Sequence, residues 1–239
     1  MLKSGRDRLI VALDMPSQEE ARRLIATLGD AVGFYKVGLE LLFAGGLNLA
    51  TDLKHMGKHV FLDMKLLDIA HTVERAVANA SELGLDFLTV HGTDLKTLRA
   101  AVSGRGHSKL KLLAVTVLTN LGQDDLTQQG STLSPGELVV RRATMAREAG
   151  FDGVVASGLE AARVRQMAGP GFLIVTPGIR LPGGTTDDQE RVTTPESAIA
   201  SGADYIVVGR PITQASDPRI AAESFVHHIR EARKRTPKA

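Results

Sequence analysis

The sequence contains no cysteine and no tryptophan, and aromatic residues make up only 4% of its 239 positions. Without cysteine there is no disulfide framework, no thiolate metal ligand and no cysteine nucleophile. So few aromatic rings leave little material for the stacking platforms that bind single-stranded nucleic acid. The 29 basic and 27 acidic residues give a net charge of only +2. We therefore expect no nucleic-acid partner.

Long apolar runs are also missing. The N-terminal segment has a basic start, but its short apolar run is broken by Asp14. We predict no signal peptide, no membrane span and a cytoplasmic protein. Hydrophobic residues make up 43% of the chain, enough for a full core. Because no low-complexity linker divides the sequence, we expect residues 1–239 to form a single domain.

Eight short apolar runs alternate with amphipathic stretches. Such continuous runs are typical of parallel strands covered by helices. One amphipathic stretch starts with Ser17, a helix N-cap with Glu20 three residues later as in a capping box, and several end in glycine. The pattern predicts an α/β fold, a (β/α)8 TIM barrel. A doubly wound sheet is the alternative, but the turn after the first run, ALDMPSQEE, lacks its glycine fingerprint. The predicted strands cover residues 8–14, 34–38, 59–65, 86–91, 110–119, 152–157, 171–178 and 204–210.

Polar residues recur where these predicted strands end. In a barrel the C-terminal strand ends meet at one mouth, where active sites lie. We assign no role to His91, which ends the fourth strand, or to Ser157, which ends the sixth. The other polar or loop-forming positions are Asp14, Lys36, Asp63, Lys65, Asp68, Thr119, Pro177, Gly178, Arg180, Gly209 and Arg210.

The run FLDMKLLD carries three charges inside an apolar segment. Asp63 and Lys65 are two residues apart, so on a strand both point to the same face, and Lys36 on the neighbouring strand can approach them. Alternating ammonium and carboxylate groups offset one another's cost of burial, and the carboxylates keep the lysines protonated. Lys65 would then be a poor nucleophile and a well-placed proton donor. A purely structural ion-pair cluster is the alternative.

A second group of residues suggests an anion site. The last two strands of a barrel commonly build a phosphate site, and here they end in TPGIR and VVGRPIT. Gly209 permits close approach of the backbone to an anion, and Arg180 and Arg210 supply guanidinium groups. Residues 181–194 have little apolar content and predict a long loop, either a lid or a surface excursion.

Taken together, these motifs resemble the orotidine 5'-phosphate decarboxylases. The resemblance rests on Asp63-x-Lys65-x-x-Asp68-Ile69, on Lys36 in FYKVGLEL, and on TPGIR, DDQERV and VVGRPIT, and it runs from Asp14 to about Pro218. The DxKxxD pattern alone belongs to a wider suprafamily, whereas its combination with Lys36 and the phosphate motifs is much more specific. Departures are Leu67 in place of a frequent histidine, Ala70-His71 after Ile69, and Leu181 in place of a frequent proline.

The resemblance implies a carboxy-lyase that converts orotidine 5'-phosphate into UMP and carbon dioxide in pyrimidine biosynthesis, without metal or organic cofactor. It implies a homodimer with its active sites at the interface. It makes Lys65 the proton donor and places Lys36, Asp63 and Asp68 in the charge network, with Asp68, Ile69 and Thr72 supplied by the other subunit. The remaining implied contacts are Asp14 to ribose, Thr119 to substrate, Pro177 to the pyrimidine, and Arg180, Gln189, Gly209 and Arg210 to phosphate.

Two rival functions remain at this point. A magnesium-dependent sugar-phosphate decarboxylase or aldolase of the same suprafamily shares DxKxxD but typically has a glutamate ligand where Lys36 stands. A lysine there supplies a fixed cation and repels the metal ion. A non-catalytic nucleotide-binding module on a barrel scaffold is the other rival, because fold alone does not dictate function.

Overall fold

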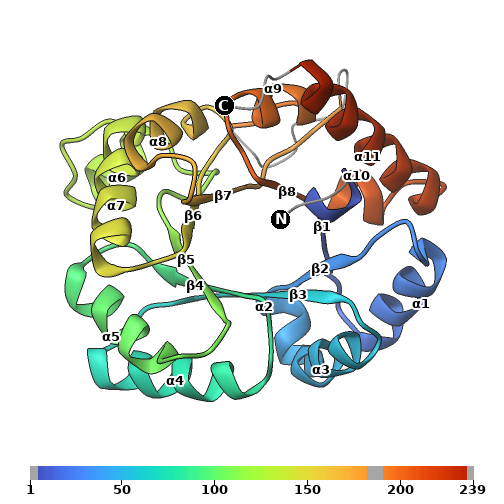
Figure 1. Cartoon of the computed structure of the whole chain (residues 1–239), viewed down its shortest axis with the longest axis horizontal. Coiled ribbons are helices and arrows are strands. Elements are labelled where there is room, and N and C mark those ends of the chain that lie inside the picture. Colours follow the sequence, from blue (N-terminus) through green and yellow to red (C-terminus); the bar gives the residue numbers. More distant parts are fainter. Residues whose placement is uncertain (1–4, 182–190, 236–239) are drawn as a thin grey trace.

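The computed structural model of the chain describes residues 5–181 and 191–235. Eight parallel strands close into a barrel in sequence order, and helices surround it (Figure 1). The predicted (β/α)8 barrel is therefore confirmed. The strands are β1 (Leu9–Ala12), β2 (Phe34–Val37), β3 (His59–Leu66), β4 (Phe87–His91), β5 (Lys111–Val115), β6 (Gly153–Val155), β7 (Leu173–Thr176) and β8 (Tyr205–Val208).

The helices follow the strands along the chain, except for the short helix η1, which precedes β1. They are η1 (Arg6–Arg8), α1 (Gln18–Leu28), α2 (Leu39–Leu41), η2 (Leu42–Gly46), α3 (Leu47–His55), α4 (Ala70–Glu82), α5 (Leu95–Arg105), α6 (Gln123–Gln128), α7 (Pro135–Ala149), α8 (Ala161–Ala168), α9 (Pro195–Ala200), α10 (Arg210–Thr213) and α11 (Pro218–Arg235). Ser17 caps α1 by accepting the Glu20 N–H at 3.2 Å. A reciprocal capping box is formed by Ser134 and Glu137 at the start of α7. Within the described ranges no helix is long and apolar enough to cross a membrane.

Two apolar clusters hold the barrel together. The larger lies between the strands and the surrounding helices, and the smaller fills the barrel interior. Phe34, Phe61 and Phe87 from β2, β3 and β4 belong to this interior cluster. The ring centroid of Phe87 lies 5.0 Å from that of Phe34 and 5.9 Å from that of Phe61. Because side chains alternate between the two faces of a strand, the residues two positions further on also point inward. Those positions are Lys36, Asp63 and Thr89.

The N-terminal rim is held by a polar motif that occurs three times. An aspartate precedes each of β4, β6 and β8, and its carboxylate accepts a backbone N–H from the preceding strand. The same carboxylate pairs with a basic side chain from the helix that precedes the earlier strand of each pair, which is β3, β5 or β7. The sets of carboxylate, amide and cation are Asp86, Val60 and Lys54; Asp152, Leu112 and Arg105; and Asp204, Ile174 and Arg165.

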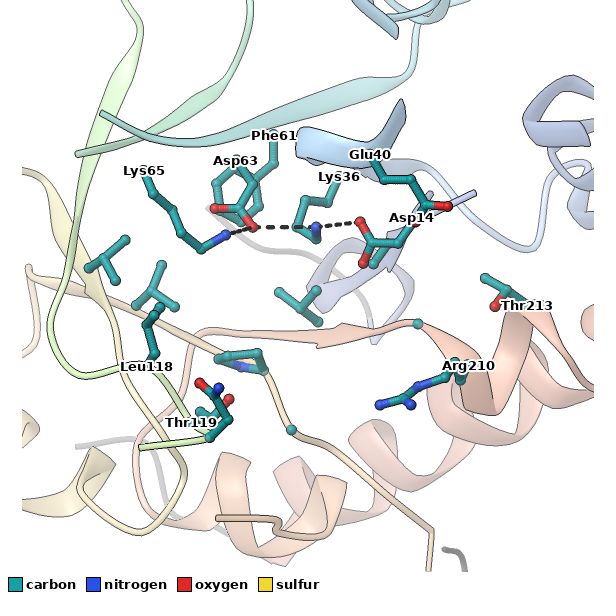
Figure 2. Close-up of a pocket in the computed structure, with 18 of the residues that line it drawn as sticks. Asp14, Lys36, Glu40, Phe61, Asp63, Lys65, Leu118, Thr119, Arg210 and Thr213 are labelled. Carbon is teal, nitrogen blue, oxygen red and sulfur yellow. Dashed lines mark hydrogen bonds and ion pairs between the residues drawn. The ribbon is translucent and has the colours of Figure 1, made fainter. Parts of the chain in front are cut away.

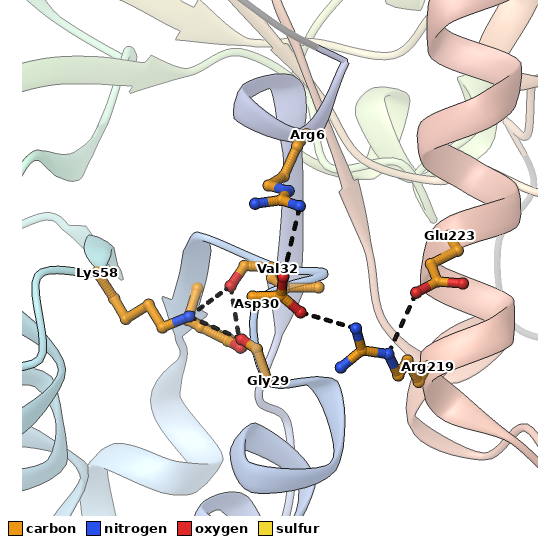
Figure 3. A network of polar contacts seen from close by, with 8 residues as sticks. Arg6, Gly29, Asp30, Val32, Lys58, Arg219 and Glu223 are labelled. Atoms are coloured by element: carbon orange, nitrogen blue, oxygen red, sulfur yellow. Dashed lines mark hydrogen bonds and ion pairs between the residues drawn. The ribbon is translucent and has the colours of Figure 1, made fainter.

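The first pair of strands departs from this motif. Gly33 precedes β2, so there is no carboxylate, and the Leu9 N–H of β1 bonds instead to the Arg6 carbonyl of η1. Close by, Asp30 pairs with Arg219 of α11 at 2.7 Å, while Lys58 donates to two loop carbonyls at 2.8 Å (Figure 3). The Asp30–Arg219 pair joins the loop between α1 and β2 to α11, and the Lys58 contacts join the same loop to the residue before β3.

Candidate active site

A cavity of about 820 Å³ opens at the C-terminal ends of the strands. The predicted site residues that line it come from six of the eight strands or the segments that follow them. They are Asp14, Lys36, Asp63, Lys65, Thr119, Pro177, Arg180, Gly209 and Arg210. In Figure 2, Lys65 and Arg210 lie on opposite sides of this space. The cavity is thus polarised, with a charge cluster on one wall and a guanidinium group on the other.

The charge cluster forms one continuous chain (Figure 2). Lys36 Nζ lies 2.9 Å from Asp14 Oδ1 and 3.3 Å from Asp63 Oδ2. Asp63 Oδ2 in turn accepts a hydrogen bond from Lys65 Nζ at 2.9 Å. Within one chain the alternation is therefore Asp14–Lys36–Asp63–Lys65. The spacing argument anticipated the last three members, whereas Asp14 was expected only at the ribose.

Neighbouring charges set the protonation of Lys36 and Asp63. Burial by itself disfavours the Lys36 ammonium, but the charges of Asp63 and Asp14 outweigh it and raise the pKa of Lys36. Burial likewise disfavours the Asp63 carboxylate, yet Lys36 and Lys65 outweigh it and lower the pKa of Asp63. Both groups are thus charged at neutral pH. His91, at the end of β4, has its pKa lowered by burial and by the charges of Arg142 and Lys65, so it is neutral there.

Several predicted site residues lie elsewhere. Asp68 and Thr72 are exposed, Ile69 is 72% exposed, and none of the three lines the cavity of its own chain. The Asp68 carboxylate accepts the N–H of Ile69 at 2.6 Å. Gln189, and with it most of the predicted loop at residues 181–194, lies outside the described residues. Ser157 is buried, with its hydroxyl accepting the Leu159 N–H.

Sequence reasoning missed two buried residues beside the site. Thr89 on β4 is fully buried and hydrogen-bonds to both Asp63 and the Lys65 backbone. The same two-residue alternation that found Asp63 could have found it, since Thr89 lies two residues before His91. Arg191 donates to the Val117 and Leu118 carbonyls at 3.1 Å each, directly before Thr119.

Arg191 is itself held by a buried partner. Its guanidinium lies 3.0 Å from Glu160 Oε1, and both side chains are under 10% exposed. Burial raises the pKa of Glu160, an effect that the charge of Arg191 partly offsets. The pair joins the chain before α9 to the start of α8, while the carbonyl contacts of Arg191 join it to the segment after β5. No local sequence signal marks a contact between residues 31 positions apart.

Comparisons with known proteins extend the description. Residues 7–225 match the family model described as "Orotidine 5'-phosphate decarboxylase / HUMPS family". A relative from Methylobacterium nodulans, named orotidine 5'-phosphate decarboxylase, is 56% identical, with 96% of this chain and 98% of the relative covered. One of the same name from Rhodopseudomonas palustris (strain BisA53) is 53% identical, covering 94% and 95%. The crystal structure of orotidine 5'-phosphate decarboxylase from Lactobacillus acidophilus superposes with a TM-score of 0.81 at 39% identity, covering 92% of this chain and 98% of that one.

A closed barrel of eight parallel strands, with charged side chains gathered at their C-terminal ends, defines a (β/α)8-barrel enzyme. Within that class the chain belongs to the orotidine 5'-phosphate decarboxylase / HUMPS family.

Proposed function

We propose that this protein is an orotidine 5'-phosphate decarboxylase, a carboxy-lyase that forms UMP and carbon dioxide in de novo pyrimidine biosynthesis. Family membership and relatives more than half identical over nearly the whole chain support the activity. The single observation that carries it is the alternating set Lys36–Asp63–Lys65 on the cavity wall. We further propose that residues 1–239 form one barrel domain that acts in the cytoplasm.

The chemistry requires a fixed positive charge. Loss of carbon dioxide from C6 of the pyrimidine leaves an electron pair in an in-plane orbital, which the ring π system cannot delocalise. With no organic electron sink, the protein has to stabilise this charge electrostatically. Lys65 is suited to the task because its ammonium is held by Asp63 at 2.9 Å and faces the cavity. We assign to Lys65 both the stabilisation of the carbanion and its protonation at C6.

Asp63 and Lys36 hold that ammonium in place. Asp63 is ionised because its pKa is lowered by Lys36 and Lys65 against the effect of burial. In the proposed complex its carboxylate lies near the carboxylate that departs from the substrate. Lys36 anchors Asp63 from the other side and bridges to Asp14, which we assign to the ribose hydroxyls. An array fixed before substrate binds needs no reorganisation during the reaction.

The opposite wall of the cavity is assigned to the phosphate. Arg210 lies there (Figure 2), Arg180 and Gly209 also line the cavity, and a guanidinium fork matches phosphate oxygens. We add Gln189 to this group from the family resemblance alone. Thr119 and Pro177 line the same cavity; we assign Pro177 to the pyrimidine and Thr119 to a further substrate contact. The phosphate would bind far from C6, so its binding energy serves to position the ring and exclude water.

We also propose a homodimer in which each active site is completed by the partner. Asp68, Ile69 and Thr72 are the assigned contributions, and they are exposed and outside their own cavity, as residues that reach across an interface would be. Phe43 and Leu67 are also exposed, at 88% and 56%. Phe43 follows β2 and Leu67 follows the adjacent β3, so both apolar side chains belong to the same region of the barrel rim.

The proposed reaction needs no metal ion. Lys36 Nζ stands between the carboxylates of Asp14 and Asp63, where it supplies the positive charge that a divalent cation would otherwise bring. In residues 5–181 and 191–235, no three His, Cys, Asp or Glu side chains are grouped to hold a metal. Turnover of orotidine 5'-phosphate, followed by ultraviolet absorbance, should therefore be unchanged by EDTA. Loss of activity on chelation, restored by magnesium, would favour the magnesium-dependent alternative.

Replacing Lys65 tests the catalytic assignment. Lys65→Ala should lower kcat by at least about 10³-fold, because a group that both stabilises and protonates the carbanion is removed. The fold should survive, since the Lys65 side chain is 30% exposed. The matched control is Lys96→Ala on the exposed face of α5, which should keep wild-type turnover. Substantial turnover by Lys65→Ala would refute the proton-donor role, and absence of turnover in the wild type would favour a non-catalytic binding module.

A further inference from the structure

The backbone at Lys65 is unusual. Among the described residues, Lys65 is the one non-glycine position with a positive φ, at 49°. The pairing of β3 with β4 shifts at the same place, where Leu62 pairs with Leu88 and Leu66 pairs with Val90. Four steps along β3 therefore correspond to two along β4. A bulge of two extra residues places Asp63 and Lys65 together at the cavity, so a regular strand does not account for their arrangement.

Thr89 is the β4 residue that faces this bulge. It lies between Leu88 and Val90, and its side chain is fully buried. Its hydroxyl donates to Asp63 Oδ1 at 2.9 Å and accepts the backbone N–H of Lys65, also at 2.9 Å. Asp63 Oδ2 accepts from Lys65 Nζ. The three residues thus form a closed ring of hydrogen bonds, in which the Thr89 hydroxyl donates one bond and accepts another.

This ring explains how a strained backbone persists. A left-handed conformation is unfavourable for a residue with a Cβ, and such strain remains only where surrounding contacts over-determine it. In the bulge, the Lys65 N–H has the Thr89 hydroxyl as its partner in place of a regular ladder bond. Removing the hydroxyl leaves a partly buried N–H unpaired and removes one hydrogen bond from the Asp63 carboxylate. Both changes favour rearrangement of the bulge.

We propose that Thr89 is a positioning residue for the proposed decarboxylation, whose hydroxyl holds the Lys65 backbone in its left-handed bulge and fixes the orientation of Asp63. The inference rests on the proposed function of Lys65. Thr89 does not line the cavity, whereas Asp63 and Lys65 do, so it acts through them. A misdirected Lys65 Nζ raises the energy of the transition state more than it weakens substrate binding, because the assigned phosphate contacts lie across the cavity.

The charges around Asp63 define a second readout. Lys36 from β2 and Lys65 from β3 lie within 3.3 Å of its carboxylate. Asp14 lies beyond Lys36, and His91 on β4 is close enough to interact with the Asp63 charge. Thr89 contributes a hydrogen bond to the charged form, in addition to these ionic contacts. Its loss raises the pKa of Asp63, so the acid limb of the pH–kcat profile moves to higher pH.

The experiment compares Thr89→Val with Thr89→Ser and Thr116→Val. Valine is nearly isosteric but has no hydroxyl, so kcat should fall about tenfold to a hundredfold with KM for orotidine 5'-phosphate nearly unchanged. Serine keeps the hydroxyl and should recover most of kcat and the wild-type acid limb. Thr116 is equally buried and donates to the Val155 carbonyl away from the charge cluster. Thr116→Val should match the loss of stability but keep wild-type kcat and pH profile.

The outcomes separate this inference from the proposed function. If the wild type turns over substrate but Thr89→Val resembles Thr116→Val in kcat and acid limb, the positioning role is overturned. If the wild type has no activity, the proposed function fails, and a crystal structure of Thr89→Val decides the inference. An unchanged Lys65 φ and Asp63 orientation would then overturn it, whereas a rearranged bulge supports it. Should Thr89→Val not fold, Thr89→Ala is judged by the same criteria.

Discussion

At the scale of single residues, the site depends on charges that stabilise one another. Lys36 is buried yet has a raised pKa, and Asp63 is buried yet has a lowered one. Neither state would persist alone, because an unpaired buried charge costs several kcal/mol. Lys36 and Asp63 are therefore coupled, and removing either one changes the pKa of the other. This coupling keeps the ammonium of Lys65 beside a carboxylate that remains ionised.

Replacing Asp63 by asparagine should destabilise the protein in a pH-dependent way. Asp63→Asn leaves Lys36 buried with only Asp14 as partner, so the free energy of unfolding at pH 7 should fall by about 3–5 kcal/mol. Because the pKa of Asp63 is lowered from 3.8 in the folded state, its stabilising contribution is present above that value and is lost as the pH falls below it. The difference between variant and wild type should therefore shrink in acid.

Urea unfolding at pH 7 and at successively lower pH measures this change. Asp124→Asn on the exposed surface of α6 is the matched control and should unfold like the wild type at every pH. A gap between Asp63→Asn and the wild type that stayed constant down to the acid transition would show that the carboxylate charge is not what stabilises the cluster.

The residue scale also shows how far sequence reasoning reaches. Alternation along strands correctly predicted that Lys36, Asp63 and Lys65 meet, although a bulge in β3, and not a regular strand, holds Asp63 and Lys65 at the cavity. Thr89 obeys the same alternation but was overlooked, since a threonine inside an apolar run resembles an ordinary strand residue. Arg191 could not be found in this way. Its partners are carbonyls and a carboxylate distant in sequence, and only the folded chain brings them together.

At the scale of elements, the sequence located all eight strands but not the distortion in one of them. Apolar runs bounded by polar residues are a local signal, and each predicted strand overlaps an observed one. The bulge in β3 depends instead on the register with β4, which no local pattern encodes. The regular elements thus follow from periodicity, whereas the functional irregularity follows from tertiary contacts.

The repeated aspartate motif at the N-terminal rim should contribute directly to stability. In the β5–β6 set, Asp152 accepts the Leu112 N–H at 2.9 Å and lies 2.6 Å from Arg105. Asp152→Ala leaves that amide and the guanidinium without this partner, so we expect a loss of roughly 2–4 kcal/mol in unfolding free energy. Urea denaturation measures the loss, and turnover should be little affected because the motif lies at the opposite end of the barrel from the cavity.

A double-mutant cycle with Arg105→Ala apportions this loss. The two side chains are 24% and 18% exposed, so their interaction is only partly screened by solvent. The sum of the two single-variant losses in unfolding free energy should exceed the loss of the double variant by about 0.5–3 kcal/mol. Strictly additive effects would mean that Asp152 does not act through Arg105, which would leave the Leu112 amide and Lys111 as its partners.

At the scale of the whole molecule, the barrel presents apolar side chains that its own core does not bury. Phe43, Leu67 and Ile69 are all more than half exposed, and they follow the adjacent strands β2 and β3. Exposed apolar residues gathered in one region commonly mark an interaction surface. Asp68 and Thr72 come from the same stretch of chain as Leu67 and Ile69. In the proposed dimer, association of the two chains therefore also completes each active site.

Ile69→Asp should accordingly weaken association and activity together. A buried charge at an apolar contact should raise the dimer dissociation constant at least about tenfold, measured by sedimentation. Turnover per chain should then fall on dilution at concentrations where the wild type stays dimeric. Ile220→Asp on α11 is the control. Ile220 is 65% exposed, close to the 72% of Ile69, but α11 lies away from α4, which Ile69 precedes (Figure 1). If both variants sedimented and turned over like the wild type, the region after β3 would not be the dimer contact, and Asp68 would have no route into a neighbouring site.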